Sequence, residues 1–162
     1  MHEGPSLDRI DRRLLRLLAK DARSSNKELA AAVGLAPSSC HARVRRLERE
    51  GHLRGYHASV DPEALGLRIR AMIFVQVARH SKEMLDAFWN YVRAQPEVVD
   101  TFYVAGSHDV IIHVAVRDVE HLRELVNERI SSHEAIGRLE TSLIFEHAHE
   151  PVPPAIPALG LD

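Results

Sequence analysis

The sequence predicts an α+β protein of two domains, and three observations support this prediction. Apolar residues recur at helical spacing through most of the first 50 residues. From residue 70 onward, strand-length apolar runs alternate with helical segments. The charge divides at the same place: residues 1–60 carry 12 Lys and Arg against 7 Asp and Glu, whereas residues 61–162 carry 9 against 16. A basic first part joined to an acidic second part indicates that only the first part meets a polyanion.

Two helices are expected before residue 35. The first runs from Asp8, its N-cap, to about Lys20. The second begins with Ser25 and Glu28, which have the spacing of a capping box, in which each side chain accepts a hydrogen bond from the other residue's backbone. It ends at Gly34, because glycine best tolerates the left-handed conformation that follows a helix.

A third helix is expected from Pro37 to about Glu50, since proline is favoured at the first helical position. Its apolar stripe is narrow and consists of Cys40, Val44 and Leu47. The rest of the helix is polar or basic. A short helix, a glycine-containing turn and an arginine-rich amphipathic helix are typical of a helix-turn-helix domain, here of the winged-helix-like type. An extended segment is expected over residues 53–60.

The remainder of the chain has the order βαββαβ, which is the ferredoxin-like unit. Strands are expected over residues 70–77, 98–105 and 110–116, and a last strand follows Gly137 and runs to about Glu146. Helices are expected over residues 81–94 and, after an N-cap at Asp118, along an apolar face of Leu122, Leu125, Val126 and Ile130. This fold places both helices on one face of the sheet, yet the strands are apolar on both faces, with Met72 and Phe74 alternating with Ile73 and Val75. The second face is therefore expected to be covered by another subunit, so a homodimer is predicted.

These elements predict a first domain over residues 1–60, a linker over 61–69, a second domain over 70–147 and a Pro-rich tail over 148–162. A cytoplasmic protein without a membrane partner is expected, because no signal peptide is visible and no apolar stretch is long enough to cross a bilayer. The single cysteine excludes an internal disulfide. The eleven histidines show no His-Glu-x-x-His spacing, so no metal or other cofactor is expected.

Several motifs resemble the Lrp/AsnC family, the leucine-responsive or feast/famine transcriptional regulators. They are LDRIDRRLL at residues 7–15, VGLAPSSCHARVRRLE at 33–48, GHLRGY at 51–56 and GSHD at 106–109. The last is similar to the family's Gly-x-x-Asp turn, and the resemblance covers roughly residues 7–146. It implies a DNA-binding domain, a linker and an effector-binding domain, in dimers that often assemble into octamers and bind an amino acid near that turn. Two positions depart from the family's pattern, Ala36 where serine is common and His108 where an aromatic is usual.

The third helix is expected to lie in the major groove of double-stranded DNA, with its N-terminal half nearest the bases. The residues best placed for the bases are Ser38, Ser39, Ala42, Arg43 and Arg46. Phosphate contacts are expected from Arg45, Arg49 and Arg54. On this prediction Arg46→Ala weakens DNA binding with much less effect on the fold.

The turn between the second and third strands is a candidate effector site. It consists of Gly106, Ser107, His108 and Asp109, and Tyr103 or His108 could shape the pocket. Gly106 allows close approach of the backbone, turn amides can hold a carboxylate, and Asp109 can pair with an ammonium group. The alternative is a tight hairpin that binds nothing.

The leading hypothesis is a sequence-specific DNA-binding transcriptional regulator that responds to a small effector, an amino acid, and is not an enzyme. One alternative is an enzyme similar to the siroheme decarboxylases, which a coloured, tetrapyrrole-bound protein would indicate. The acidic second domain is poorly suited to that polyanionic ligand. The other alternative is a DNA-architectural protein without a ligand, which a thermal-shift screen of effectors would distinguish.

Overall fold

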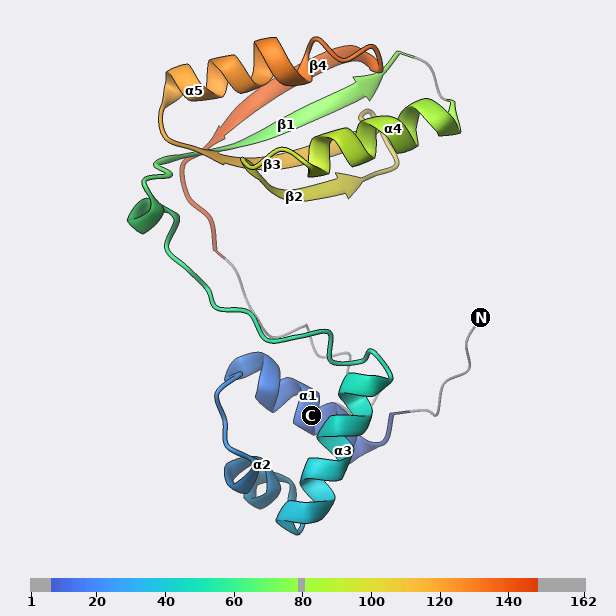
Figure 1. Ribbon diagram of the computed structural model, residues 1–162, viewed down its shortest axis with the longest axis vertical. Helices are drawn as coiled ribbons and strands as arrows, with labels where there is room; N and C mark the ends of the chain where they lie inside the picture. Colours follow the sequence, from blue (N-terminus) through green and yellow to red (C-terminus); the bar gives the residue numbers. More distant parts are fainter. Residues whose placement is uncertain (1–6, 79–80, 149–162) are drawn as a thin grey trace. The chain divides into compact units, whose positions relative to one another are not determined.

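The computed structural model describes residues 7–78 and 81–148. The chain divides into two compact units, one ending at Ser59 and the other spanning Val60–His147 (Figure 1). Each unit has its own cluster of buried apolar side chains. Apart from Ala148, the tail expected over residues 148–162 lies outside the described residues.

The first unit contains the three expected helices: α1 (Arg9–Lys20), α2 (Asn26–Val33) and α3 (Pro37–Arg49). Both predicted N-caps are confirmed. Asp8 and Asp11 form a reciprocal capping box at α1, and Ser25 and Glu28 form one at α2. Gly34 ends α2 with φ of 70°, the left-handed conformation for which glycine was expected.

The core of the first unit joins all three helices. Its fully or nearly buried apolar side chains are Leu14, Leu18, Leu29, Ala30, Cys40 and Leu47. Burial raises the pKa of the Cys40 thiol, so this side chain is a packing group without thiolate reactivity. Ala36 provides no side-chain cap to α3. Instead, the Asn26 amide donates a hydrogen bond of 2.8 Å to the carbonyl of Pro37 and fastens the start of α3 to α2.

The segment from residue 53 to residue 69 is only partly as expected. Residues 53–60 belong to neither a helix nor a strand, so the described structure has no wing strand there. Within the predicted linker, Pro62–Leu65 forms a short 3-10 helix, η1, with Asp61 as its N-cap. The first strand begins at Ile69.

The second unit has the expected ferredoxin-like order. Its elements are β1 (Ile69–Val77), α4 (Lys82–Arg93), β2 (Val98–Tyr103), β3 (Val110–Val116), α5 (Val119–Glu124), η2 (Leu125–Ile130) and β4 (Ile136–Ile144). The strands form one sheet in the order β2-β3-β1-β4, and every neighbouring pair is antiparallel. β2 ends two residues earlier than expected, and β4 both begins and ends two residues earlier.

The last helical segment departs from a regular α-helix. After α5, the η2 segment is π-helical, and the Ser131 amide donates to the carbonyl of Val126, five residues earlier. Leu125 and Ile130, which are fully buried, are also five residues apart. The wider π turn therefore brings both side chains onto the sheet, which a regular helix would not do for this spacing.

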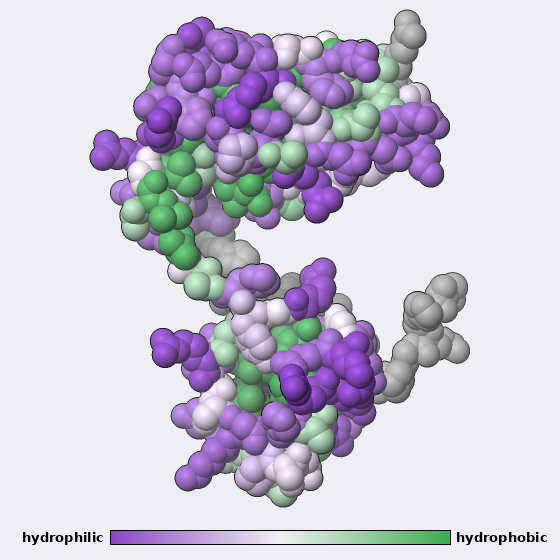
Figure 2. Space-filling view, viewed as in Figure 1, coloured by the Kyte–Doolittle hydropathy of each residue, from purple (hydrophilic) through white to green (hydrophobic). Residues whose placement is uncertain are grey.

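The two faces of the sheet have different surroundings. Figure 1 shows α4 and α5 on the same side of the sheet, where Ile73 and Ile112 are fully buried against Phe88 of α4. The outer surface on this helical side is largely hydrophilic (Figure 2). Met72 and Ile111 alternate with the buried residues, so they face the other side, and each is only partly buried. None of the helices in the described ranges is long and apolar enough to span a membrane.

A buried carboxylate holds the helical layer to the sheet. Glu97, just before β2, accepts hydrogen bonds from Arg129 of η2 at 2.6 Å and from His121 of α5 at 2.8 Å. Burial acts to raise the pKa of Glu97, but the bonds from Arg129 and His121 prevail and lower it to about 2. Glu97 therefore stays ionised at any ordinary pH and ties the start of β2 to both later helical segments.

Candidate nucleic-acid interface

The side of α3 that is opposite its core carries an exposed stripe. Cys40 and Leu47 are fully buried against α1 and α2. Steps of four, three and four residues place one set of exposed side chains on the opposite side: Ser38, Ala42, Arg45 and Arg49. All four belong to the DNA-contacting set expected from the sequence. We refer to them as the outward stripe.

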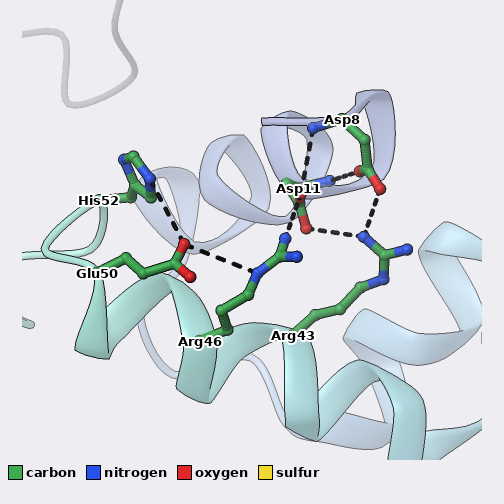
Figure 3. A network of polar contacts seen from close by, with 6 residues as sticks. All are labelled: Asp8, Asp11, Arg43, Arg46, Glu50 and His52. Carbon is green, nitrogen blue, oxygen red and sulfur yellow. Dashed lines mark hydrogen bonds and ion pairs between the residues drawn. The ribbon is translucent and has the colours of Figure 1, made fainter. Parts of the chain in front are cut away.

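A second side of α3 faces the start of α1 through an ion-pair network (Figure 3). The Arg43 guanidinium donates to Asp8 at 2.5 Å and to Asp11 at 2.9 Å. The Arg46 guanidinium donates to the other oxygen of Asp11 at 2.5 Å, and its Nε lies 3.8 Å from Glu50. Two arginines of α3 are thus bound to two carboxylates of the α1 N-terminal turn.

Asp11 is the centre of this network because only 1% of its side chain is exposed. A buried carboxylate must be paired and hydrogen-bonded to be tolerated. Asp11 meets this requirement with both arginines and with the backbone amide of Asp8, at 3.1 Å. The amide of Asp11 and the Arg43 guanidinium lower the pKa of Asp8, and the same carboxylates raise the pKa of Arg43.

These contacts change the roles expected for Arg43 and Arg46. The sequence assigned both to DNA bases, but the structure directs both guanidinium groups at α1. Ser39 lies exposed on the same side of α3. The sequence does contain a signal for this pairing, since the two carboxylates are three residues apart, as are the two arginines. Matching spacing of opposite charges on two helices indicates that they can pair across a packed interface.

The remaining side of α3 contacts the segment that follows the helix. The Tyr56 hydroxyl donates to Oε1 of Glu48 at 3.1 Å, and Oε2 of Glu48 lies 3.4 Å from Arg45. The residues that line a hollow of about 270 Å³ include Tyr56, Glu48, Arg45 and His41, together with Leu18 and Leu29 of the core. None of Glu48, His41 and Tyr56 was expected to form part of the site. Arg54, expected to contact phosphate, lies exposed in the same segment.

The candidate effector turn joins the ends of three strand segments. The Asp109 amide donates to the carbonyl of Val75 at 2.9 Å, and its Oδ2 accepts from the amide of Val77 at 2.9 Å. The Val104 amide donates to the carbonyl of Asp109 at 3.0 Å and closes the turn. Asp109 therefore has a structural role that the sequence did not indicate, because it fastens the start of β3 to the end of β1.

The other expected effector residues surround this point. Gly106 has φ of 143°, which favours glycine, and the space around it is open. The Ser107 hydroxyl is 3.1 Å from Nδ1 of His108, whose ring lies 5.2 Å from that of Phe74. Tyr103 is 62% exposed at the end of β2.

Comparison with known proteins relates both units to one group. Residues 7–48 match the model of the AsnC-type helix-turn-helix domain, and residues 70–152 match that of the Lrp/AsnC ligand binding domain. The HTH-type transcriptional regulator AldR of Mycolicibacterium smegmatis is 45% identical over 141 residues, covering 87% of this chain and 82% of AldR. The leucine-responsive regulatory protein of Escherichia coli K12 is 33% identical, covering 91% and 90%.

A solved structure agrees with these relatives. The crystal structure of a Neisseria meningitidis transcriptional regulator in complex with L-methionine matches with a TM-score of 0.85 and 30% identity. The match covers 92% of this chain and 97% of that one. The relatives are named as transcriptional regulators, which agrees with the expectation that the chain is not an enzyme.

Proposed function

The chain belongs to the Lrp/AsnC family of helix-turn-helix transcriptional regulators, and from this premise we propose that it binds a specific DNA sequence as a homodimer under the control of an amino acid. The observation that carries the proposal is the outward stripe of α3. It presents two exposed arginines and a serine on a helix whose other sides are packed or ion-paired.

Arg45 and Arg49 of the stripe take the base-reading role, because guanidinium groups pair bidentately with guanine in the major groove. Ser38 and Ala42 offer a hydroxyl and a methyl group to neighbouring base edges. Ser39 and Arg54, exposed beside the stripe, are assigned to backbone phosphates. Arg43 and Arg46 act on DNA indirectly, by holding α3 against α1 at the angle that the groove requires.

The effector is assigned to the turn that runs from Gly106 to Asp109. Its open glycine and its partly buried carboxylate offer backbone amides to an α-carboxylate and a negative charge to an α-ammonium group. The L-methionine complex of the Neisseria meningitidis regulator supports an amino acid as the ligand class.

The homodimer is assigned to the sheet face that carries no helix. Met72, Phe74 and Ile111 lie on this face, and Phe102 on it is 46% exposed. An apolar sheet face of this kind is stabilised when a second copy covers it.

The experiment that tests DNA recognition compares affinities for the protein's own promoter duplex and for a shuffled duplex, measured by fluorescence anisotropy over a series of salt concentrations. The wild type is expected to prefer the promoter, and both affinities are expected to fall steeply with salt because phosphate contacts release counterions.

Arg45→Ala is expected to weaken promoter binding ~10-fold. Arg93→Ala, which removes an exposed arginine from α4, is the matched control and leaves binding unchanged. A wild type without preference at any salt concentration contradicts the proposed function.

A further inference from the structure

Glu48 lies between the outward stripe of α3 and the segment that follows the helix. One of its carboxylate oxygens accepts the Tyr56 hydroxyl at 3.1 Å, and the other lies 3.4 Å from the Arg45 guanidinium. The three side chains thus form a chain of contacts from residue 56 to the outward stripe. Arg45 and Glu48 belong to the family motif over residues 33–48, and Tyr56 ends the motif over residues 51–56, but the proposed base-reading role uses only Arg45.

The position of Tyr56 is set by the backbone that leads to it from the end of α3. The amide of Leu53 donates to the carbonyl of Leu47 at 3.0 Å, so the chain turns back along α3 directly after the helix ends. Leu53 also packs against the core of the first unit. Gly55 has φ of 147°, a conformation that other residues rarely adopt, and it directs the next residue toward Glu48.

In the hydrogen bond between Tyr56 and Glu48, the phenol is the donor and the carboxylate is the acceptor. Tyr56 is 47% exposed, and partial desolvation and the nearby Glu48 carboxylate both raise its pKa, so the phenol keeps its proton and remains a donor. Arg45, by contrast, is 69% exposed, and an exposed ion pair alone scarcely restricts a long side chain. The carboxylate can orient Arg45 only if the carboxylate itself is held, and Tyr56 is the group that holds it.

We propose that Tyr56 and Glu48 are positioning residues that orient Arg45 for reading DNA. The proposal rests on the proposed function, because it assumes that Arg45 faces the bases. An arginine that is oriented before binding loses less side-chain entropy when it pairs with a base.

The test is a double-mutant cycle of Tyr56→Phe and Arg45→Ala. Tyr56→Phe removes one hydroxyl and changes no charge, so it is expected to weaken promoter binding about fivefold. The affinity of this variant for shuffled duplex, and the salt dependence of its DNA binding, are expected to stay at wild-type values. In the Arg45→Ala background, the same substitution is expected to have no further effect, because the group that Tyr56 orients is gone.

Two further variants make the result specific. Tyr91→Phe also removes a hydroxyl that donates a hydrogen bond, to the carbonyl of Arg129 in the second unit, and it is expected to leave DNA binding unchanged. Glu48→Gln keeps an acceptor for Tyr56 but removes the charge that attracts Arg45. It is expected to lower discrimination between the two duplexes in the wild-type background and not in the Arg45→Ala background.

Each outcome separates this inference from the proposed function. A wild type that shows no promoter preference overturns the proposed function itself. A wild type that does show preference, with Tyr56→Phe either silent or equally harmful in the presence and absence of Arg45, overturns the positioning role alone. Non-additive losses with an unchanged salt dependence support it.

Discussion

At the scale of single residues, Asp11 determines how α3 is attached to the rest of the first unit. Its buried carboxylate binds Arg43 and Arg46, which are 32 and 35 residues further along the chain. Loss of one partner of a buried ion pair is costly, because the remaining charges lose their compensation. The family motif residues of α1 and α3 therefore meet as structural partners, while the residues proposed to read DNA lie on another side of α3.

Asp11→Asn is expected to destabilise the first unit by about 2 kcal/mol, since both arginines lose a charged partner but can be partly hydrated. Arg46→Ala is expected to destabilise it by about 1 kcal/mol, because Asp11 keeps Arg43 and the Asp8 amide. Arg49→Ala, on the outward stripe, is the control and stays within ~0.5 kcal/mol of the wild type. Hydrogen exchange measured by mass spectrometry reports each change on peptides from α1 and α3.

In Asp11→Asn and Arg46→Ala, peptides from residues 69–144 are expected to keep the wild-type protection from hydrogen exchange. Equal protection of α1 in Asp11→Asn and in Arg49→Ala would contradict the role assigned to Asp11. The sequence predicts that Arg46→Ala chiefly lowers DNA affinity with little effect on the fold, and the ion pair with Asp11 adds this expected loss of stability.

At the scale of elements, the turn between β2 and β3 combines a structural and a proposed binding role. The Asp109 carboxylate accepts the amide of Val77, so any substitution here affects the end of β1 as well as the ligand. Asparagine retains a carbonyl oxygen for that amide and lacks the charge that an ammonium group requires. Asp109→Asn therefore separates the two roles better than alanine does.

Thermal-shift measurements over a panel of L-amino acids, L-methionine among them, test this element. The wild type is expected to gain thermal stability with at least one amino acid, and Asp109→Asn is expected to lose that gain while unfolding at nearly the same temperature without ligand. Asp86→Asn, at an exposed position of α4, is the matched control and keeps the response. The same ligand-induced shift in Asp109→Asn and the wild type would refute the assignment to this turn.

At the scale of the whole molecule, the sheet has a helical layer on one face only. The described residues of the helix-free face include partly buried Met72 and Ile111 at the centre of the sheet and exposed Phe102 on β2. The register places Phe102, Ile111 and Phe74 side by side, next to Glu140 of β4, so the face combines an apolar row with polar side chains, as subunit interfaces do.

Met72→Glu is expected to shift the protein toward the monomer mass of 18.2 kDa, because an unpaired carboxylate at the centre of an apolar interface is strongly unfavourable. Asn90→Glu introduces the same residue at an exposed position of α4, on the opposite face of the sheet, and it is expected to keep the wild-type mass. Light scattering coupled to size-exclusion chromatography measures both masses, and circular dichroism checks that both variants are folded. A Met72→Glu protein with the wild-type oligomeric mass would contradict the proposed interface.

The sequence alone determined the features that depend on near neighbours. Helix starts at Asp8 and Ser25, the end of α2 at Gly34 and the βαββαβ order follow from capping chemistry and hydrophobic periodicity, which act over a few residues. The exposed stripe of α3 could also be predicted, since it is opposite the narrow apolar stripe. The π-helical turn at Leu125–Ile130 could not, because helical periodicity alone does not reveal an extra residue in a turn.

Only the tertiary structure decided what the charged side chains bind. Helical phase separates Arg43 and Arg46 from Arg45 and Arg49, but it does not reveal that the first two meet Asp8 and Asp11 while the last two lie exposed. The Asp109 carboxylate likewise accepts a hydrogen bond from the backbone amide of Val77 in β1, 32 residues earlier in the chain. The physical reason is that hydrophobic burial sets the positions of the helices and strands, and the partner of each charge then depends on which distant group that packing brings within hydrogen-bonding distance.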